Sequence, residues 1–341
     1  MAVPTTPEPA EPPVPVVDMA VNEEEAARTV REACETTGFF YVKNHGIAED
    51  LMNKQFAVAK QFFDLSTEKK ETIKVNKYYR GWTPMNDEKL SILGDQKAPD
   101  QKEGLYIGRE VAEGSEENKL PLHGPNNWPA ESLVPGYREA MMNYHQACID
   151  CTRRINRLIA LALDLPATFF DDDFTHLIAS MRPLHYSAVV SNPEQGIFGA
   201  GAHTDYGMLT ILATDDKPGL QVLMGGKWVD IPPKEGHLII NLGDMLHRWS
   251  NGRFHSGMHR VVIHKGQERY STAFFAEPNF KTVIAPLPTC VSEANPAKWP
   301  PTTSGEYLLS KYGVTHSTYM ERQKEKGADQ QCTGPAPIAV N

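Results

Sequence analysis

The feature that most constrains the fold is a series of short β-type segments between residues 180 and 279. The segments are rich in Val, Ile, Leu and Tyr, and Gly, Pro and Asp residues separate them at nearly regular spacing. They are RPLHYSAVV, LTILATD, LQVLM, KWVDI, HLIINL, HRVVIH and RYSTAFF. Short strands with turn signals at regular spacing are typical of an antiparallel sandwich or barrel. The sequence therefore predicts a continuous β core in this part of the chain.

Helical patterns lie on both sides of the β-rich region. Asn22, followed by three Glu residues, predicts the start of a first helix, and a second helix is expected over residues 49–63. A long helix is expected over residues 136–163 and a last one over residues 304–326. Residues 76–130 show weak periodicity and much Gly, Pro and Asn, so long loops are expected there. The expected fold class is mainly β with flanking helices (α+β).

The charge balance and the cysteine count limit the class of protein. The chain has 341 residues, with 34 Lys and Arg against 43 Asp and Glu, and no basic block. Such a chain lacks the positive surface expected of a protein that binds nucleic acid or an anionic membrane. No apolar run reaches the ~20 residues of a membrane span, and no signal peptide is visible. Five scattered cysteines favour a reducing, cytoplasmic location, and no feature of the sequence identifies a protein partner.

A histidine and an aspartate stand two residues apart in the motif HTD. His203 and Asp205 would project from the same face of a strand or strand end, so both could contact one ion. A motif of this kind on its own is weak evidence for a metal site. A third ligand would have to come from a distant strand.

The third ligand is expected in the segment GMHRVVIH. Alternation places His259 on an apolar, inward face and Arg260 on the opposite face, but a register slip of one residue would exchange the faces. Poorer alternatives are His247, His255 and His264. By itself, His259 would more often be a hydrogen-bonded core histidine. Two imidazoles and one carboxylate together form the facial triad that is associated with non-haem Fe(II) oxygenases.

The next segment, ERYSTAFF, adds a possible anion site. Arg269 and Ser271 share one strand face with Ala273 and Phe275. An arginine on the inward face of a barrel strand is costly unless an anion meets it. A guanidinium and a hydroxyl two residues apart could together bind the far carboxylate of a dicarboxylic acid. The alternative is an arginine on an edge strand that faces solvent.

Together, these motifs resemble the core of the isopenicillin N synthase-like, plant and fungal type 2-oxoglutarate/Fe(II)-dependent dioxygenases. The matching core segments are HTDYGMLTIL, GLQVL, KWVDIPP, IINLGDMLHRWSNGRFHSGMHRVV and ERYSTAFFAEPN. VPVVDM and GFFYVKNHGI are similar to the N-terminal region of that family, so the resemblance spans about residues 14–320. The joint spacing of the motifs is far more specific than any single motif.

The resemblance implies a double-stranded β-helix, or jelly-roll, core. It implies the ligands of Fe(II): His203, Asp205 and His259. It implies the residues that bind 2-oxoglutarate: Arg269, Ser271 and Tyr186. No catalytic residue beyond the metal ligands is then required. Many relatives have Asn two residues before that Tyr, whereas this chain has Leu184, so the co-substrate would have one polar contact fewer.

The function that the resemblance implies is oxidation, most often hydroxylation, of a small organic metabolite, as in secondary metabolism. The reaction would use O2 and release succinate and CO2, and ascorbate is an expected reductant. Residues suspected of contact with the substrate lie in the loop-rich region and at the end of ERYSTAFF: Tyr79, Arg80, Trp82, Tyr106 and Phe275. The identity of the substrate does not follow from the sequence.

The expected organisation has six parts. They are a disordered Pro-rich tail (1–15), an N-terminal non-haem dioxygenase region (16–130), a long helix and connector (131–179), the Fe(II)/2-oxoglutarate dioxygenase jelly-roll core (180–285), a C-terminal helical cap (286–326) and a tail (327–341). Three other functions stay open at this point: a same-fold Fe(II) oxidase that does not use 2-oxoglutarate, a non-enzymatic jelly-roll protein with a structural metal, and a zinc hydrolase. The last is the weakest, because no Glu that could activate a nucleophile follows the HTD motif.

Overall fold

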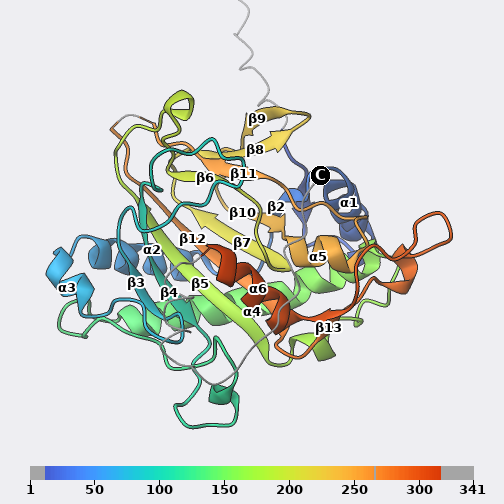
Figure 1. Ribbon diagram of the computed structural model, residues 1–341, viewed down its shortest axis with the longest axis horizontal. Coiled ribbons are helices and arrows are strands. Elements are labelled where there is room, and N and C mark those ends of the chain that lie inside the picture. The colour runs from blue at the N-terminus through green and yellow to red at the C-terminus, as the bar shows by residue number, and fades with distance from the viewer. Residues whose placement is uncertain (1–11, 265, 316–341) are drawn as a thin grey trace, which may run out of the picture.

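Two sheets form the centre of the molecule (Figure 1). The computed structural model describes residues 12–264 and 266–315. Most of the expected N-terminal tail, the expected tail 327–341 and residues 316–326 of the expected last helix lie outside the described residues. The larger sheet has the strand order β1-β2-β10-β7-β12-β5-β4-β3, and the smaller has the order β6-β11-β8-β9.

The boundaries of the elements follow the sequence patterns closely in the β core. The strands are β1 (Val16–Asp18), β2 (Phe39–Lys43), β3 (Gly81–Thr83), β4 (Lys102–Gly108), β5 (Leu177–Tyr186), β6 (Ala200–His203), β7 (Leu209–Thr214), β8 (Leu220–Met224), β9 (Lys227–Asp230), β10 (Leu238–Leu242), β11 (His259–Val261), β12 (Arg269–Asn279), β13 (Val283–Ile284) and β14 (Thr302–Thr303). Each of the seven predicted segments contains a strand between β5 and β12, and the HTD motif begins at the end of β6. The expected β core is therefore present.

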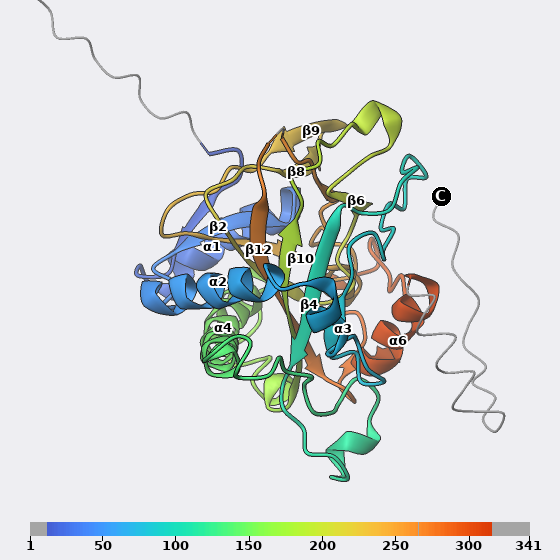
Figure 2. The same cartoon turned by 90° about the vertical axis from the view of Figure 1, so that its left-hand side faces the viewer.

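Helices flank the larger sheet. They are α1 (Glu23–Thr36), α2 (Glu49–Phe63), α3 (Thr67–Glu71), α4 (Tyr137–Ala162), α5 (Asp244–Trp249) and α6 (Ser304–Thr315). Asn22 caps α1 as expected, because its side-chain oxygen accepts the Glu25 N–H at 2.9 Å. Helices α2 and α4 pack against β12 on one side of the sheet, whereas α6 lies on the opposite side (Figure 2). Among the described residues, no helix has the length and apolar character needed to cross a membrane.

The prediction of long loops over residues 76–130 was wrong for two segments, because β3 and β4 lie there and extend the larger sheet. Strand β4 is buried along its whole length although it begins with two charged residues. Lys102 faces the interior between the sheets, while Glu103 points to the helical side and accepts hydrogen bonds from Lys70 Nζ (2.8 Å) and Trp82 Nε1 (2.8 Å). Buried charges of this kind are tolerated only when they are paired. Because the partner Lys70 is 33 residues away in the sequence, local pattern did not reveal the strand.

Candidate active site

His203, Asp205 and His259, here called the metal triad, converge between the two sheets. β6 and β11 are antiparallel neighbours, and their register places His203 opposite His259. Asp205 follows two residues after the end of β6. Asp205 Oδ1 lies 3.9 Å from the Nε2 atom of each histidine, and the three candidate ligand atoms lie within 4.8 Å of one another. The structure thus brings His259, and not the alternatives His247, His255 and His264, to His203 and Asp205.

The outer nitrogen of each triad histidine is held by a backbone carbonyl. His203 Nδ1 lies 2.7 Å from Gly201 O, and His259 Nδ1 lies 3.1 Å from Gly257 O. A carbonyl oxygen can only accept a hydrogen bond, so each Nδ1 carries a proton, and in the neutral ring each Nε2 then keeps its lone pair for a metal. Burial and the neighbouring His259 lower the pKa of His203 to about 4, which favours the neutral, ligating form of the ring.

The two oxygens of the Asp205 carboxylate also have different partners. Its Oδ2 atom accepts hydrogen bonds from Thr210 Oγ1 (2.5 Å) and Asn241 Nδ2 (2.6 Å), while Oδ1 faces the two imidazoles. Burial by itself would raise the pKa of Asp205, but the two imidazoles and these hydrogen bonds hold it below its usual value. The triad therefore offers one ionised oxygen and two neutral nitrogens, a donor set that suits Fe(II) and leaves other coordination positions open.

Beside the triad, Arg269 and Ser271 present buried polar atoms that lack a partner. Arg269 is 2% exposed, and its Nε and Nη1 atoms make no hydrogen bond within the described part of the chain. Ser271 Oγ is also buried without a partner, and the Arg269 guanidinium lies 5.0 Å from the centre of the Tyr186 ring. A buried cation with free donors is costly unless an anion binds it. The pair thus fits the carboxylate of a 2-oxo dicarboxylic acid.

Strand register explains how this anion site is assembled. In the larger sheet, Lys102 of β4 pairs with Tyr186 of β5, and Tyr186 pairs with Arg269 of β12. Leu184 occupies the next pocket-facing row, opposite Ser271, and lines the same cavity. At the position where many relatives have Asn, this chain therefore presents an apolar side chain to the pocket.

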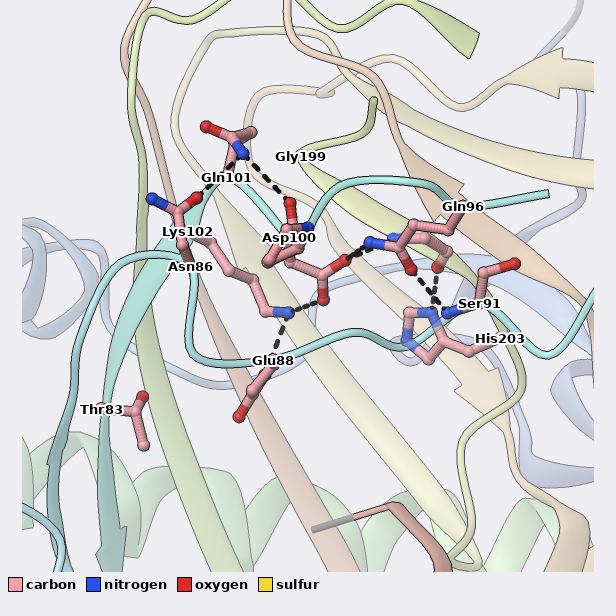
Figure 3. A network of polar contacts seen from close by, with 12 residues as sticks. Thr83, Asn86, Glu88, Ser91, Gln96, Asp100, Gln101, Lys102, Gly199 and His203 are labelled. Atoms are coloured by element: carbon pink, nitrogen blue, oxygen red, sulfur yellow. Dashed lines mark hydrogen bonds and ion pairs between the residues drawn. The ribbon is translucent and has the colours of Figure 1, made fainter. Parts of the chain in front are cut away.

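A buried polar network connects the residue range 84–101 to the metal triad (Figure 3). Lys102 Nζ forms ion pairs with Asp100 and, at 3.0 Å, with Glu88. Asp100 Oδ1 accepts the Gly201 N–H at 2.9 Å, and the carbonyl of the same Gly201 accepts the proton on His203 Nδ1. Asp100, which is fully buried, thereby fixes the strand segment that orients His203.

We expect Asp100→Asn to lower both stability and metal affinity. The amide would leave Lys102 without one of its two carboxylates, a loss of about 3–5 kcal/mol in the free energy of unfolding for a broken buried pair. A neutral amide oxygen accepts the Gly201 N–H less strongly than a carboxylate does, and a less firmly held Gly201 would weaken metal binding by about 10–100-fold, as is typical of residues that support a ligand. Urea unfolding and metal titration measure the two effects, with the exposed Asp95→Asn as the control. Unchanged metal affinity in a destabilised variant would show that the network acts only on the fold.

The comparisons with known proteins agree with this geometry. Residues 14–131 match the family model described as non-haem dioxygenase in morphine synthesis N-terminal, and residues 179–278 match that of the 2OG-Fe(II) oxygenase superfamily. The azadirone synthase of Melia azedarach is 40% identical over 299 residues, which are 84% of this chain and 88% of that protein. The chain belongs to the 2OG-Fe(II) oxygenase superfamily. The 2-oxoglutarate-Fe(II) type oxidoreductase hxnY of Emericella nidulans is 36% identical over 308 residues, which are 87% of this chain and 86% of that protein.

A solved structure supports the same assignment. A full-length Neurospora crassa protein in complex with alpha-KG and thymine is 32% identical and has a TM-score of 0.78, covering 88% of this chain and 96% of that chain. The expected jelly-roll core is thereby confirmed. This 2OG-Fe(II) oxygenase is a dioxygenase that uses Fe(II), 2-oxoglutarate and O2 and oxidises a small organic metabolite. The oxidase, structural-metal and zinc-hydrolase alternatives are not favoured, and the role of ascorbate stays a prediction.

The structure brings some of the suspected substrate contacts into the oxygenase pocket and leaves others outside it. Tyr106 and Phe275 line the pocket. Tyr79, which does not line it, stacks on Tyr312, which does. Two residues lie elsewhere: Arg80 donates to backbone carbonyls of residues 78, 79 and 122, and Trp82 donates to Glu103 on the helical side of the sheet. The terminal nitrogens of Arg80 and the indole N–H of Trp82 are thus occupied in holding loops and strands together.

Three charged residues of the pocket were missed by the sequence analysis: Lys102, Arg182 and Glu277. Arg182 binds Glu88 through both terminal nitrogens, at 2.6 and 3.0 Å. No local signal marks Lys102 or Arg182, because their partners come from the region expected to form loops. A signal for Glu277 was available, since it continues the alternation of β12 two residues beyond Phe275.

Proposed function

We propose that the metal triad holds Fe(II) in this enzyme, that Arg269, Ser271 and Tyr186 bind 2-oxoglutarate beside it, and that a small metabolite is hydroxylated in the remaining pocket. One observation carries the assignment. A triad with three inward donor atoms and a buried arginine with unpartnered nitrogens line the same cavity. A cation site and a carboxylate site in one cavity match a co-substrate that binds the metal at one end and the arginine at the other.

The residues of the chain position the reactants and exclude water from the site. When bound, the metal and the 2-oxo acid supply oxidising power from O2 and yield succinate and CO2. The backbone carbonyls that bind the two histidines fix the direction of Nε2, and Thr210 and Asn241 hold the Asp205 carboxylate. Apolar side chains such as Leu184 and Phe275 form the walls of the pocket and exclude water. No acid or base from the protein is required.

The proposal is tested by adding 2-oxoglutarate to the Fe(II)-loaded protein without oxygen. We expect a visible metal-to-ligand charge-transfer band to appear, and succinate to form after oxygen and a substrate are supplied. Two controls lack the 2-oxo group and should give no band. They are the protein with Fe(II) alone and the protein with Fe(II) and succinate. Bound Fe(II) with no band at saturating 2-oxoglutarate would contradict the assignment of the two sites.

We also place the enzyme in the cytoplasm. The described cysteines are buried thiols without a disulfide: Cys34, Cys148, Cys151 and Cys290. Such thiols suit a reducing compartment. Fractionation of cells that carry a tagged chain checks this location, and recovery in a secreted or membrane fraction would contradict it.

A further inference from the structure

Strand β12 runs across the whole pocket and presents alternate side chains to it. The pocket-facing residues of β12 are Arg269, Ser271, Ala273, Phe275 and Glu277. Arg269 and Ser271 lie at the end assigned to 2-oxoglutarate. Glu277 lies at the other end, next to a register irregularity of the β12–β5 pair between Glu277 and Asn279. Irregularities of this kind often redirect a side chain near an active site.

Most charged residues that line the pocket already have a partner or a role. Lys102 pairs with Asp100 and Glu88, and Arg182 pairs with Glu88. The metal triad and Arg269 are assigned to the metal and the co-substrate. Within the part of the chain that the structure describes, Glu277 is the charged lining residue left without a counterion.

The surroundings of Glu277 hold its carboxyl group in place, but the described part of the chain offers it no cationic partner. Glu277 is 5% exposed, and its Oε2 atom accepts the Met208 N–H at 2.5 Å. No described residue donates a hydrogen bond to Oε1. The carboxyl lies against Gly207, where a Cβ atom would overlap it. Burial raises the pKa of Glu277 to about 8, because its effect outweighs that of the Met208 hydrogen bond and the nearby Asp205 adds a smaller rise.

We propose that Glu277 is a substrate-recognition residue and that the substrate of this enzyme carries a basic nitrogen, an amine or a guanidine, which binds Glu277 Oε1. The inference rests on the proposed function, since it takes the substrate to bind beside the metal triad. Because burial raises the pKa of Glu277, its carboxyl group is largely protonated near pH 7 when no cation lies beside it. A positively charged nitrogen would favour the ionised carboxylate and supply its counterion. A neutral analogue cannot form this ion pair and would meet a protonated carboxyl group instead, so the site prefers the cation.

The other walls of this end of the pocket suit such a substrate. Tyr106, Tyr206 and Tyr312 offer aromatic rings, and Leu308 and Phe275 add apolar surface. Arg182 and Lys311 already lie over the Tyr106 and Tyr206 rings, so these walls serve to bury the carbon skeleton of the substrate. The metal triad lines the same cavity as Glu277, so a substrate held at Glu277 would present its carbon atoms to the metal.

The test compares methylguanidinium with N-methylurea, a neutral molecule of nearly the same shape. Mn(II) replaces Fe(II), 2-oxoglutarate is present, and paramagnetic broadening of the probe's methyl proton signal reports binding near the metal. Binding of Mn(II) and of 2-oxoglutarate is verified first on the same sample. If the proposed function is wrong, Mn(II) or 2-oxoglutarate fails to bind in this first step, and that result is distinct from a failure of the probe to bind.

We expect methylguanidinium to bind the wild-type enzyme at least tenfold more tightly than N-methylurea. Glu277→Gln should abolish this preference, because the amide can still accept the Met208 N–H but carries no charge. Glu293→Gln, at an exposed position, should retain it. If Glu277→Gln does not fold, equal binding of the two probes to the wild-type enzyme would still overturn the proposal.

Three results would overturn the proposal. Equal binding of the two probes would show that Glu277 does not select for charge. Absence of methylguanidinium binding to the Mn(II)/2-oxoglutarate complex would exclude a cation site, because the probe is small enough to reach Glu277. If Glu277→Gln still prefers methylguanidinium to N-methylurea, another residue selects the charged probe. Glu277 would then only hold the backbone at Met208.

Discussion

Arg269→Ala is expected to weaken 2-oxoglutarate binding by about 100- to 1000-fold, because loss of a buried charge-assisted pair costs about 3–4 kcal/mol. The affinity for Fe(II) should stay nearly unchanged, since Arg269 makes no contact with the metal triad among the hydrogen bonds and ion pairs of the described residues. Titration of the charge-transfer band with 2-oxoglutarate measures the first quantity, and Fe(II) binding in the absence of 2-oxoglutarate measures the second.

The same variant separates a ligand-binding arginine from a structural one. Arg269 is buried and has unpartnered nitrogens, so its removal should leave the free energy of unfolding of the ligand-free protein unchanged or raise it. Arg269→Lys should bind 2-oxoglutarate with intermediate affinity, because an ammonium keeps the charge but not the planar fork. Arg260→Ala, which removes a partly exposed arginine from β11, is the control. Strong destabilisation of Arg269→Ala with unaltered 2-oxoglutarate affinity would contradict the assigned role.

The parts of the site that follow from strand alternation could be predicted from the sequence. Residues two apart in a strand share a face whatever the rest of the fold does. Arg269 and Ser271 accordingly line the pocket together, whereas Thr272 points to the helices and donates to Gln55. The pairing of His203 with His259 required a long-range register, and here the joint spacing of the family motifs supplied what local pattern could not.

The parts that depend on long-range charge pairing could not be predicted in this way. Lys102 begins a segment rich in charge and glycine, which is typical of a loop, and it becomes a strand residue because β5 and the Asp100 and Glu88 carboxylates surround it. Arg80 and Trp82 lie in a segment with the composition of a binding loop, yet the terminal nitrogens of Arg80 and the indole N–H of Trp82 donate to protein acceptors. Local composition shows which groups are polar but not whether other parts of the chain will satisfy them.

Glu277 is a different case, since the alternation that identified Arg269 extends to it. The segment ERYSTAFF predicts a strand only as far as Phe275, and Pro278, a residue type that often ends a strand, follows three residues later. In the structure β12 continues to Asn279. A proline at the irregular end of a paired strand therefore need not interrupt the face that precedes it.

Asp205→Ala is expected to abolish turnover and to reduce metal affinity by more than the roughly 10–100-fold that loss of a supporting residue causes. The variant removes the only carboxylate of the metal triad and leaves two neutral imidazoles to hold a divalent cation. Turnover is followed as succinate formation. Metal affinity is followed by titration with Mn(II), which needs no oxygen-free handling.

A measurement of stability gives an independent readout of the same substitution. A metal that binds the folded protein and is present at about 100 times its Kd raises the free energy of unfolding by about 2.7 kcal/mol. The wild-type enzyme should therefore melt at a higher temperature with saturating Mn(II) than with a chelator, and so should the exposed control Asp216→Ala. Asp205→Ala should melt at the same temperature in both conditions. A full metal-dependent shift in Asp205→Ala would mean that the cation binds elsewhere in the chain, and the assignment of the metal triad would then be wrong.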